Sequence, residues 1–358
     1  MDDLKVRLPH KSYDIFIGSN ILKDIREQIN NTVNLDNSVK KIAIITDSNV
    51  EKIYGSTIVE LLSYDNTIGI KLITIRPGEQ SKNLKTVERL YNELLDFHIT
   101  RSDLIIAFGG GVVGDISGFV AATFLRGVPF IQIPTTLLAQ VDSSVGGKVA
   151  INLPKGKNLV GSFYHPDGVF IDVGLLQTLK DRYFTDGLSE IIKYGCIKDR
   201  DLFYQLLRLD ELNKNSKDIA NIIYKCCDIK RKIVEEDERD IGNRMILNFG
   251  HTIGHAIEKA YNYKKYTHGE AVAMGMYHIT NKSEAQGLTE RGTTKILKKI
   301  LEKYNLPYEL PDVVRDEILD NVKLDKKTKG DTINLILLSK IGEGYIKEIN
   351  ITEVSKFI

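Results

Sequence analysis

Apolar segments of strand length alternate with segments of helical periodicity through the first half of the chain. The strand-like runs lie at residues 41–46, 68–75, 103–108, 130–133 and 168–172, and the helical patterns between them at 21–29, 49–62, 84–96 and 116–124. Strands that alternate with helices at this spacing are typical of a mostly parallel sheet of the Rossmann type. An alternating pattern over residues 4–17 predicts a β-hairpin ahead of this sheet.

The densest run of glycines follows the strand-like run 103–108. Residues 109–115 read Gly-Gly-Gly-Val-Val-Gly-Asp, which satisfies Gly-x-Gly-x-x-Gly between a predicted strand and a predicted helix. Bare backbone amides at a helix N-terminus form a cradle for a pyrophosphate. A tight turn without a ligand stays open as an alternative, because no acidic residue lies on the strand about 20 residues onward. Asp47, just past the run 41–46, is the better candidate for binding a ribose hydroxyl.

Residues 141–166 form a region that is rich in glycine and is predicted to be irregular. Lys148 stands there within an otherwise apolar run, which favours an anion-binding role over a solvent-facing one. Together with Arg126, Lys157 and Asn158 it predicts a local cationic cluster suited to phosphate and carboxylate groups.

The pattern becomes helical from about residue 175, which predicts two domains, 1–174 and 175–358. Helical periodicity recurs at 179–196, 202–209, 217–236, 291–304 and 311–321. Residues 334–339 and 344–348 are predicted to form a short hairpin on the helical domain.

Three of the seven histidines fall within eighteen residues of the second half: His251, His255 and His268. His251 and His255 are four residues apart, so on a helix they project from one face. Two or three imidazoles and a carboxylate form an open catalytic metal site, and Glu190, on a predicted apolar helix, is a candidate carboxylate ligand. A pair of histidines on a helix surface without a metal is the alternative, and the neighbouring glycines favour the metal site.

Composition limits the partners. The formal net charge is +1, with 42% hydrophobic and 27% charged residues, so no nucleic acid or membrane partner is expected. Three cysteines without Cys-x-x-Cys spacing indicate neither a disulfide framework nor a thiolate metal site. With no signal peptide and no long apolar run, a cytoplasmic location is expected.

Four motifs, taken together, resemble the 3-dehydroquinate synthase family over essentially the whole chain. They are the glycine run 109–115, Val-Asp-Ser-Ser-Val-Gly-Gly-Lys at 141–148, Glu-Ile-Ile-Lys-Tyr-Gly at 190–195, and Asn-Phe-Gly-His-Thr-Ile-Gly-His-Ala-Ile-Glu at 248–258. The resemblance implies an α/β, Rossmann-like N-terminal domain that binds NAD, and a mainly α-helical C-terminal domain that binds Zn²⁺ or Co²⁺. It also implies an active site in the cleft between these domains, and a homodimer.

The implied reaction uses transient NAD redox and a divalent metal. It converts 3-deoxy-D-arabino-heptulosonate 7-phosphate, a phosphorylated sugar acid, to 3-dehydroquinate and phosphate, the second step of the shikimate pathway. The enzyme class would be a carbon–oxygen lyase acting on phosphates.

The resemblance also implies roles for individual residues. The metal ligands would be Glu190, His251 and His268, and His255 would face the substrate phosphate instead of the metal. The other substrate contacts would be Asp142, Lys148, Asn158, Lys193, Lys230, Arg244, Asn248, Lys326 and Arg126, the last from within the subunit or across a subunit boundary. The NAD contacts would be Asp47, Asn49, Glu79, Lys82, Gly110, Gly111, Val112, Asp115, Thr135, Thr136, Lys148 and Lys157.

Two other enzymes fit the same pattern less well. A polyol dehydrogenase of the glycerol dehydrogenase type, dependent on NAD and a metal, needs no second cationic cluster, so Lys148, Lys230 and Arg244 argue against it. A cyclase for another sugar phosphate is disfavoured where its substrate lacks the carboxylate that Arg244 and Asn248 would bind.

Overall fold

The computed structural model describes residues 2–33, 39–63, 68–311 and 331–358. The chain divides into two compact units, and the first contains Met1–Leu179 together with Ile219–Glu235. The second contains Lys180–Asp218 and Glu236–Ile358. The units are therefore not two successive halves of the chain, and the domain boundary expected after residue 174 stays a prediction.

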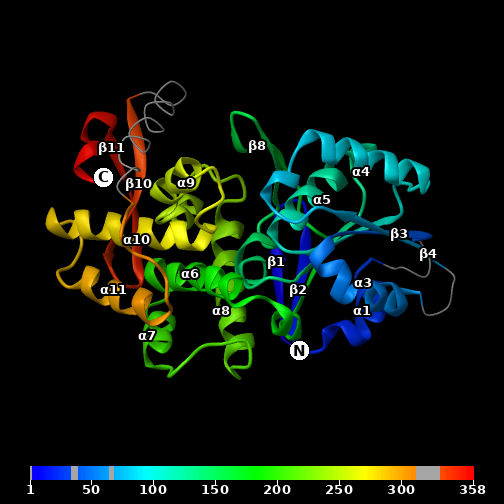
Figure 1. The fold of residues 1–358 in the computed structure, drawn as a ribbon, viewed down its shortest axis with the longest axis horizontal. Coiled ribbons are helices and arrows are strands. Elements are labelled where there is room, and N and C mark those ends of the chain that lie inside the picture. The colour runs from blue at the N-terminus through cyan, green and yellow to red at the C-terminus, as the bar shows by residue number, and fades with distance from the viewer. Residues whose placement is uncertain (1, 34–38, 64–67, 312–330) are drawn as a thin grey trace. The chain divides into compact units, whose positions relative to one another are not determined.

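The first unit is built on one mostly parallel sheet (Figure 1). Its strands are β1 (Asp2–Arg7), β2 (Ser12–Gly18), β3 (Lys41–Asp47), β4 (Gly69–Ile75), β5 (Leu104–Gly109), β6 (Phe130–Pro134) and β9 (Gly168–Asp172). Its helices are α1 (Ile25–Val33), α3 (Ser48–Leu62), α4 (Leu84–Asp96), α5 (Gly111–Thr123) and α8 (Ile219–Glu236).

The strand order is β1-β2-β9-β6-β5-β3-β4, and only the pair β1–β2 is antiparallel. From β3 the chain passes first to β4 on one side and then to β5 on the other. The strand order therefore reverses between β3 and β5, and in open α/β sheets ligands bind at the carboxyl ends of the strands at such a point. The predicted hairpin and Rossmann-like sheet are confirmed.

Alternate residues of each central strand pack against different helices. Ala43 and Ile45 of β3 face a core with α4 and α5, whereas Ile42 and Ile44 face a core with α1 and α3. Figure 1 shows these two helix pairs on opposite sides of the strands. Because both faces are covered, the strands read as continuous apolar runs, which is why the sequence located them well.

The glycine run departs from the sequence prediction. Helix α5 was expected to begin near Ile116, but it begins at Gly111, and Gly110 is its N-cap. The glycines allow this early start, because a Cβ at Gly109 would come within 2.6 Å of the Val113 side chain. From Gly111 onward the run is thus the first helical turn itself and not a loop that precedes the helix.

Residues 141–166 also differ from the expectation of an irregular region. They contain an antiparallel pair, β7 (Lys148–Leu153) and β8 (Gly156–Phe163). Val149 and Ile151 alternate inward and are buried in the core against α5. The glycine content concealed this alternation.

The second unit is mainly helical and carries a terminal hairpin. Its helices are α6 (Asp181–Ile197), α7 (Arg200–Arg208), α9 (His251–Ala260), α10 (His268–Ala285) and α11 (Thr293–Lys303), and its strands are β10 (Thr332–Lys340) and β11 (Glu343–Asn350). The hairpin prediction is confirmed, and the predicted helix 311–321 lies outside the described residues except for its first position. Among the described helices, none has the length and apolar character needed to cross a membrane.

Candidate active site

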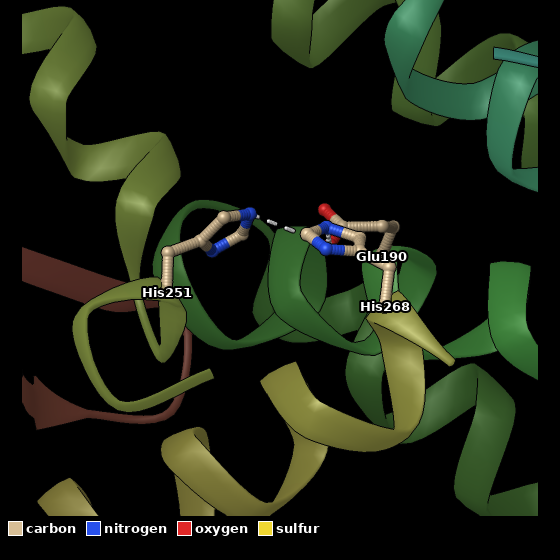
Figure 2. A group of neighbouring side chains, drawn as sticks. All are labelled: Glu190, His251 and His268. Atoms are coloured by element: carbon tan, nitrogen blue, oxygen red, sulfur yellow. Dashed lines mark ion pairs between the residues drawn. The ribbon is translucent and has the colours of Figure 1, made fainter. Parts of the chain in front are cut away.

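A carboxylate and two imidazoles converge in the second unit. Glu190 Oε1 lies 3.7 Å from His251 Nε2 and 3.6 Å from His268 Nε2 (Figure 2). One ligand atom from each of the three residues falls within 4.8 Å of the others, so the three could hold one ion. Ligand atoms that share a tetrahedral zinc ion lie about 3.4 Å apart, since each is about 2.1 Å from the metal.

Each of the three residues is presented by a different helix. Glu190 lies in the middle of α6, where an almost continuous run from Phe184 to Ile197 is buried, and its side chain is fully buried. His251 is the first residue of α9, after Gly250 in the left-handed region at φ +79°. His268 is the first residue of α10, whose N-terminus is fixed by a capping box between Thr267 and Glu270.

Glycines let these helices approach closely. A Cβ at Gly254 of α9 would lie 3.2 Å from the Val272 backbone of α10, and a Cβ at Gly250 would lie 2.7 Å from the Val272 carbonyl oxygen. At Gly269, a Cβ would overlap the carbonyl oxygen of Asp186 on α6. The backbones of α6, α9 and α10 therefore pack nearly in contact around the three side chains.

The charge of Glu190 is balanced by a lysine one helical turn later. Lys193 is 1% exposed and forms an ion pair with Glu190. Burial and the nearby Lys193 lower the pKa of His251 to about 3, which keeps its imidazole neutral. Burial also acts to lower the pKa of His268, but the Glu190 and Glu258 carboxylates outweigh it and raise that pKa well above its usual value.

Lys193→Met is expected to tighten the binding of a divalent metal about tenfold or more, because a cation beside the site repels the ion. It should also lower the melting temperature of the metal-free protein, since the buried Glu190 charge loses its counterion. Chelator competition and thermal denaturation measure these two effects. Lys198→Met, an exposed lysine at the end of the same helix, serves as the control. Weaker metal binding in Lys193→Met would contradict this account of the pair.

His255, another predicted substrate residue of the second unit, lies beside this group. His255 is exposed, and its ring centroid lies 5.5 Å from that of His251 and 6.1 Å from that of His268. Arg244 is 2% exposed and donates from Nη1 to the Glu238 carbonyl oxygen at 2.7 Å. Asn248 is exposed, and Lys326 lies outside the described residues.

The predicted NAD residues of the first unit gather at the carboxyl ends of neighbouring strands. Asp47 ends β3 and caps α3, accepting hydrogen bonds from the amides of Asn49 and Val50. Gly110, Gly111 and Val112 begin α5 directly after β5, and Thr135 and Thr136 follow β6. A Cβ at Gly110 would lie 3.0 Å from the Thr136 side chain, and Thr135 N donates to Gly109 O at 3.0 Å.

A buried lysine links the remaining predicted NAD residues. Lys82 is 3% exposed and donates to Asp115 at 2.5 Å and to Asn158 at 2.6 Å, with Glu79 at 3.6 Å. Burial acts to lower the pKa of Lys82, but Asp115 and Glu79 outweigh it and raise that pKa. Lys157 lies 4.0 Å from Glu79. The structure thus places Asn158, predicted to contact phosphate, among the residues predicted to contact NAD.

The other predicted anion-binding cations of the first unit have different surroundings. Lys230 of α8 donates to both the carbonyl and the carboxylate of Asp142 at 2.8 Å. Lys148 is exposed at the start of β7. Arg126 is exposed in a turn where Leu125, Arg126 and Gly127 all have positive φ.

Sequence reasoning missed two buried carboxylates near Glu190 and His268. Asp186 Oδ1 accepts the Gly269 amide at 2.5 Å, and Glu258 Oε2 lies 3.4 Å from His268 Nδ1. Their spacing along the chain could have indicated them. Asp186 lies one helical turn before Glu190, and Glu258 lies two turns after His251, so each shares a helix face with a candidate ligand.

Comparisons with known proteins match nearly the whole chain to one family. The family description 3-dehydroquinate synthase N-terminal matches residues 72–186, and 3-dehydroquinate synthase C-terminal matches residues 187–328. A 3-dehydroquinate synthase of Clostridium beijerinckii is 52% identical over 354 residues, covering 98% of this chain and 99% of the relative. This chain belongs to the 3-dehydroquinate synthase family. Another member, from Enterococcus faecalis, is 45% identical and covers 99% of this chain and 98% of the relative. The predicted family is confirmed.

Solved structures of other enzymes share the fold of this chain. A 2-deoxy-scyllo-inosose synthase, complexed with carbaglucose-6-phosphate, NAD⁺ and Co²⁺, has a TM-score of 0.85 and 26% identity and covers 99% of both chains. An NADH-dependent butanol dehydrogenase from Thermotoga maritima has a TM-score of 0.66 at 18% identity, and the match covers 96% of this chain and 95% of the dehydrogenase chain. At this identity the likeness shows a shared fold alone. The predicted fold class, an α/β domain with a helical C-terminal domain, is confirmed.

Proposed function

We propose that this enzyme is a carbon–oxygen lyase that converts 3-deoxy-D-arabino-heptulosonate 7-phosphate to 3-dehydroquinate and phosphate. The observation that carries the proposal is the convergence of Glu190, His251 and His268 in a chain about 50% identical, end to end, to proteins named 3-dehydroquinate synthase.

The donor set fits a divalent metal. One carboxylate and two imidazoles are three protein ligands, which leave coordination positions open for substrate, as in catalytic zinc sites. Glu190 is fully buried. The low pKa of His251 keeps its Nε2 unprotonated, so this nitrogen has a lone pair that can bind a metal ion. We propose that Glu190, His251 and His268 hold Zn²⁺ or Co²⁺; the Co²⁺ named with the 2-deoxy-scyllo-inosose synthase supports this choice.

The edge of the sheet between β3 and β5 fits a dinucleotide. The glycines after β5 leave a bare helix N-terminus, where backbone amides attract a pyrophosphate. Asp47 ends the neighbouring strand β3, at the position suited to a ribose hydroxyl. We propose that this edge binds NAD, with Glu79, Lys82, Asp115 and Lys157 as further contacts.

The chemistry is divided between the bound groups and the side chains of the chain. When bound, the metal supplies a Lewis acid that lowers the pKa of substrate hydroxyls, and NAD supplies a reversible hydride acceptor. Lys148, Asn158, Arg126 and His255 would bind the phosphate and stabilise it as it departs. Arg244, Asn248 and Lys230 would orient the carboxylate and hydroxyls, and Asp142 and Lys193 would lie beside the reacting hydroxyls. Lys326 is kept as a predicted contact.

The comparisons favour the synthase over a polyol dehydrogenase. Relatives named 3-dehydroquinate synthase reach 45–52% identity over nearly the full chain, whereas dehydrogenase structures reach 14–18%. We further propose a homodimer located in the cytoplasm, as the resemblance and composition indicated.

The deciding experiment measures phosphate and NADH together. With the heptulosonate phosphate and catalytic NAD, the enzyme should release one phosphate per substrate and accumulate no NADH. A chelator should abolish this release, and Zn²⁺ or Co²⁺ should restore it. NADH that accumulates with glycerol, without phosphate release, would instead establish the dehydrogenase.

A further inference from the structure

The two histidines that face Glu190 each turn their other ring nitrogen toward an acceptor. His251 Nδ1 lies 3.1 Å from the carbonyl oxygen of Phe249, and its Nε2 faces Glu190. His268 Nδ1 lies 3.4 Å from Glu258 Oε2, and its Nε2 also faces Glu190. The two imidazoles thus have the same orientation but different acceptors, a neutral carbonyl and a carboxylate.

We infer that Glu258 is a positioning residue that accepts the Nδ1 proton of His268, leaves Nε2 as the nitrogen that faces the metal, and thereby sets the affinity of the metal site. This inference rests on the proposed metal site. An acceptor on the far nitrogen fixes the tautomer and the ring orientation of a ligand histidine, and a carboxylate makes the imidazole a stronger donor.

The environment of Glu258 supports this role. Its side chain is 5% exposed, so the contact with His268 is shielded from water. It reaches His268 because α9 and α10 pack backbone to backbone at Gly254 and Val272. The backbone next to His268 is held independently, since Asp186 Oδ1 accepts the amide of Gly269 at 2.5 Å.

A second ion offers a different explanation of the same carboxylate. His255, Glu258 and His268 also bring ligand atoms within 4.8 Å of one another. If His268 Nε2 serves the first ion, a second ion on Nδ1 would have to displace the proton that Glu258 accepts. One ring nitrogen cannot both keep that proton and bind an ion, so the two explanations predict different numbers of bound ions.

The test measures metal affinity directly, without an activity assay. Purified metal-free protein is titrated with Zn²⁺ against a chromophoric chelator, and bound zinc is counted by elemental analysis. Glu258→Gln keeps an acceptor but loses the charge, so Zn²⁺ affinity should fall about tenfold, and Glu258→Leu should lose up to about a hundredfold. Both variants should retain at most one zinc ion per chain, as should the wild type.

Glu284→Gln on α10, the helix that carries His268, is the matched control. Glu284 accepts the amides of Gly292 at 2.8 Å and Thr294 at 2.7 Å, so its loss should lower the melting temperature of the metal-free protein and leave Zn²⁺ affinity unchanged. The Glu258 variants should lose more Zn²⁺ affinity than Glu284→Gln does. This difference should hold even if all of these variants have similarly lowered metal-free melting temperatures.

The outcomes separate the inference from the proposed function. Unchanged Zn²⁺ affinity in both Glu258 variants overturns the inference while the metal site stands. Two zinc ions per wild-type chain, reduced to one in Glu258→Gln, overturn it in favour of the second ion. A wild-type protein that binds no zinc overturns the metal site itself.

Discussion

Replacing His268 with alanine is expected to lower Zn²⁺ affinity about a hundredfold, because a four-ligand zinc site contributes roughly 10–16 kcal/mol, or about 3 kcal/mol per ligand. Turnover should be lost with the metal. His268 lies 3.6 Å from Glu190, and its ring centroid lies 5.2 Å from that of His251. Chelator competition on the purified variant and phosphate release measure these two losses.

His255→Ala is the matched variant, since His255 lies one helical turn from His251 on α9. It should retain Zn²⁺ at nearly wild-type affinity and lose turnover, because we assign His255 to the substrate phosphate. Equal metal loss in the two variants would show that His255 is also a ligand, and our division of roles would be wrong.

Gly269→Ala is expected to have the second largest effect. A Cβ at this position would overlap the carbonyl oxygen of Asp186, which is backbone and cannot rotate away. Helices α6 and α10 would have to separate, and overpacking of this kind costs about 1–3 kcal/mol, occasionally more. Because α6 carries Glu190 and α10 carries His268, the same displacement should weaken Zn²⁺ binding.

Thermal denaturation of the metal-free variant and Zn²⁺ titration test this expectation together. Gly69→Ala is the control, since a Cβ there would meet no atom closer than the Lys41 side chain at 3.5 Å. A Gly269→Ala protein with wild-type melting temperature and zinc affinity would mean that the helices yield easily, contrary to the packing described above.

Periodicity located most elements because burial imposes it. Strand β3 is covered on both faces and reads as an apolar run, and α4 shows its buried residues Val87, Leu90 and Leu94 at helical spacing. Where glycines stand in place of apolar side chains, the hydrophobic pattern does not predict the elements correctly. The pattern predicts irregular chain at the first turn of α5 and at the pair β7–β8, since glycine contributes nothing to a hydrophobic period.

The candidate site divides in the same way. His251 and His255 stand out because a short local spacing reveals them. Glu258 and Asp186 do not, because their partners, His268 and Gly269, belong to another helix and the contact depends on how closely the backbones approach. The pairing of Lys82 with Asn158 is equally invisible in the sequence, since 75 residues separate the two.

The sequence by itself determined the family, the alternation of strands and helices, and the chemical types available for the site. These follow from local periodicity and from motifs that are short along the chain. Only the tertiary structure decided that α8 joins the first unit, that Glu190 and Lys193 are buried, and that Glu258 lies against His268. The physical reason is that such contacts are set by the packing of helices against one another, and distances between packed backbones are not encoded in the spacing of any one segment.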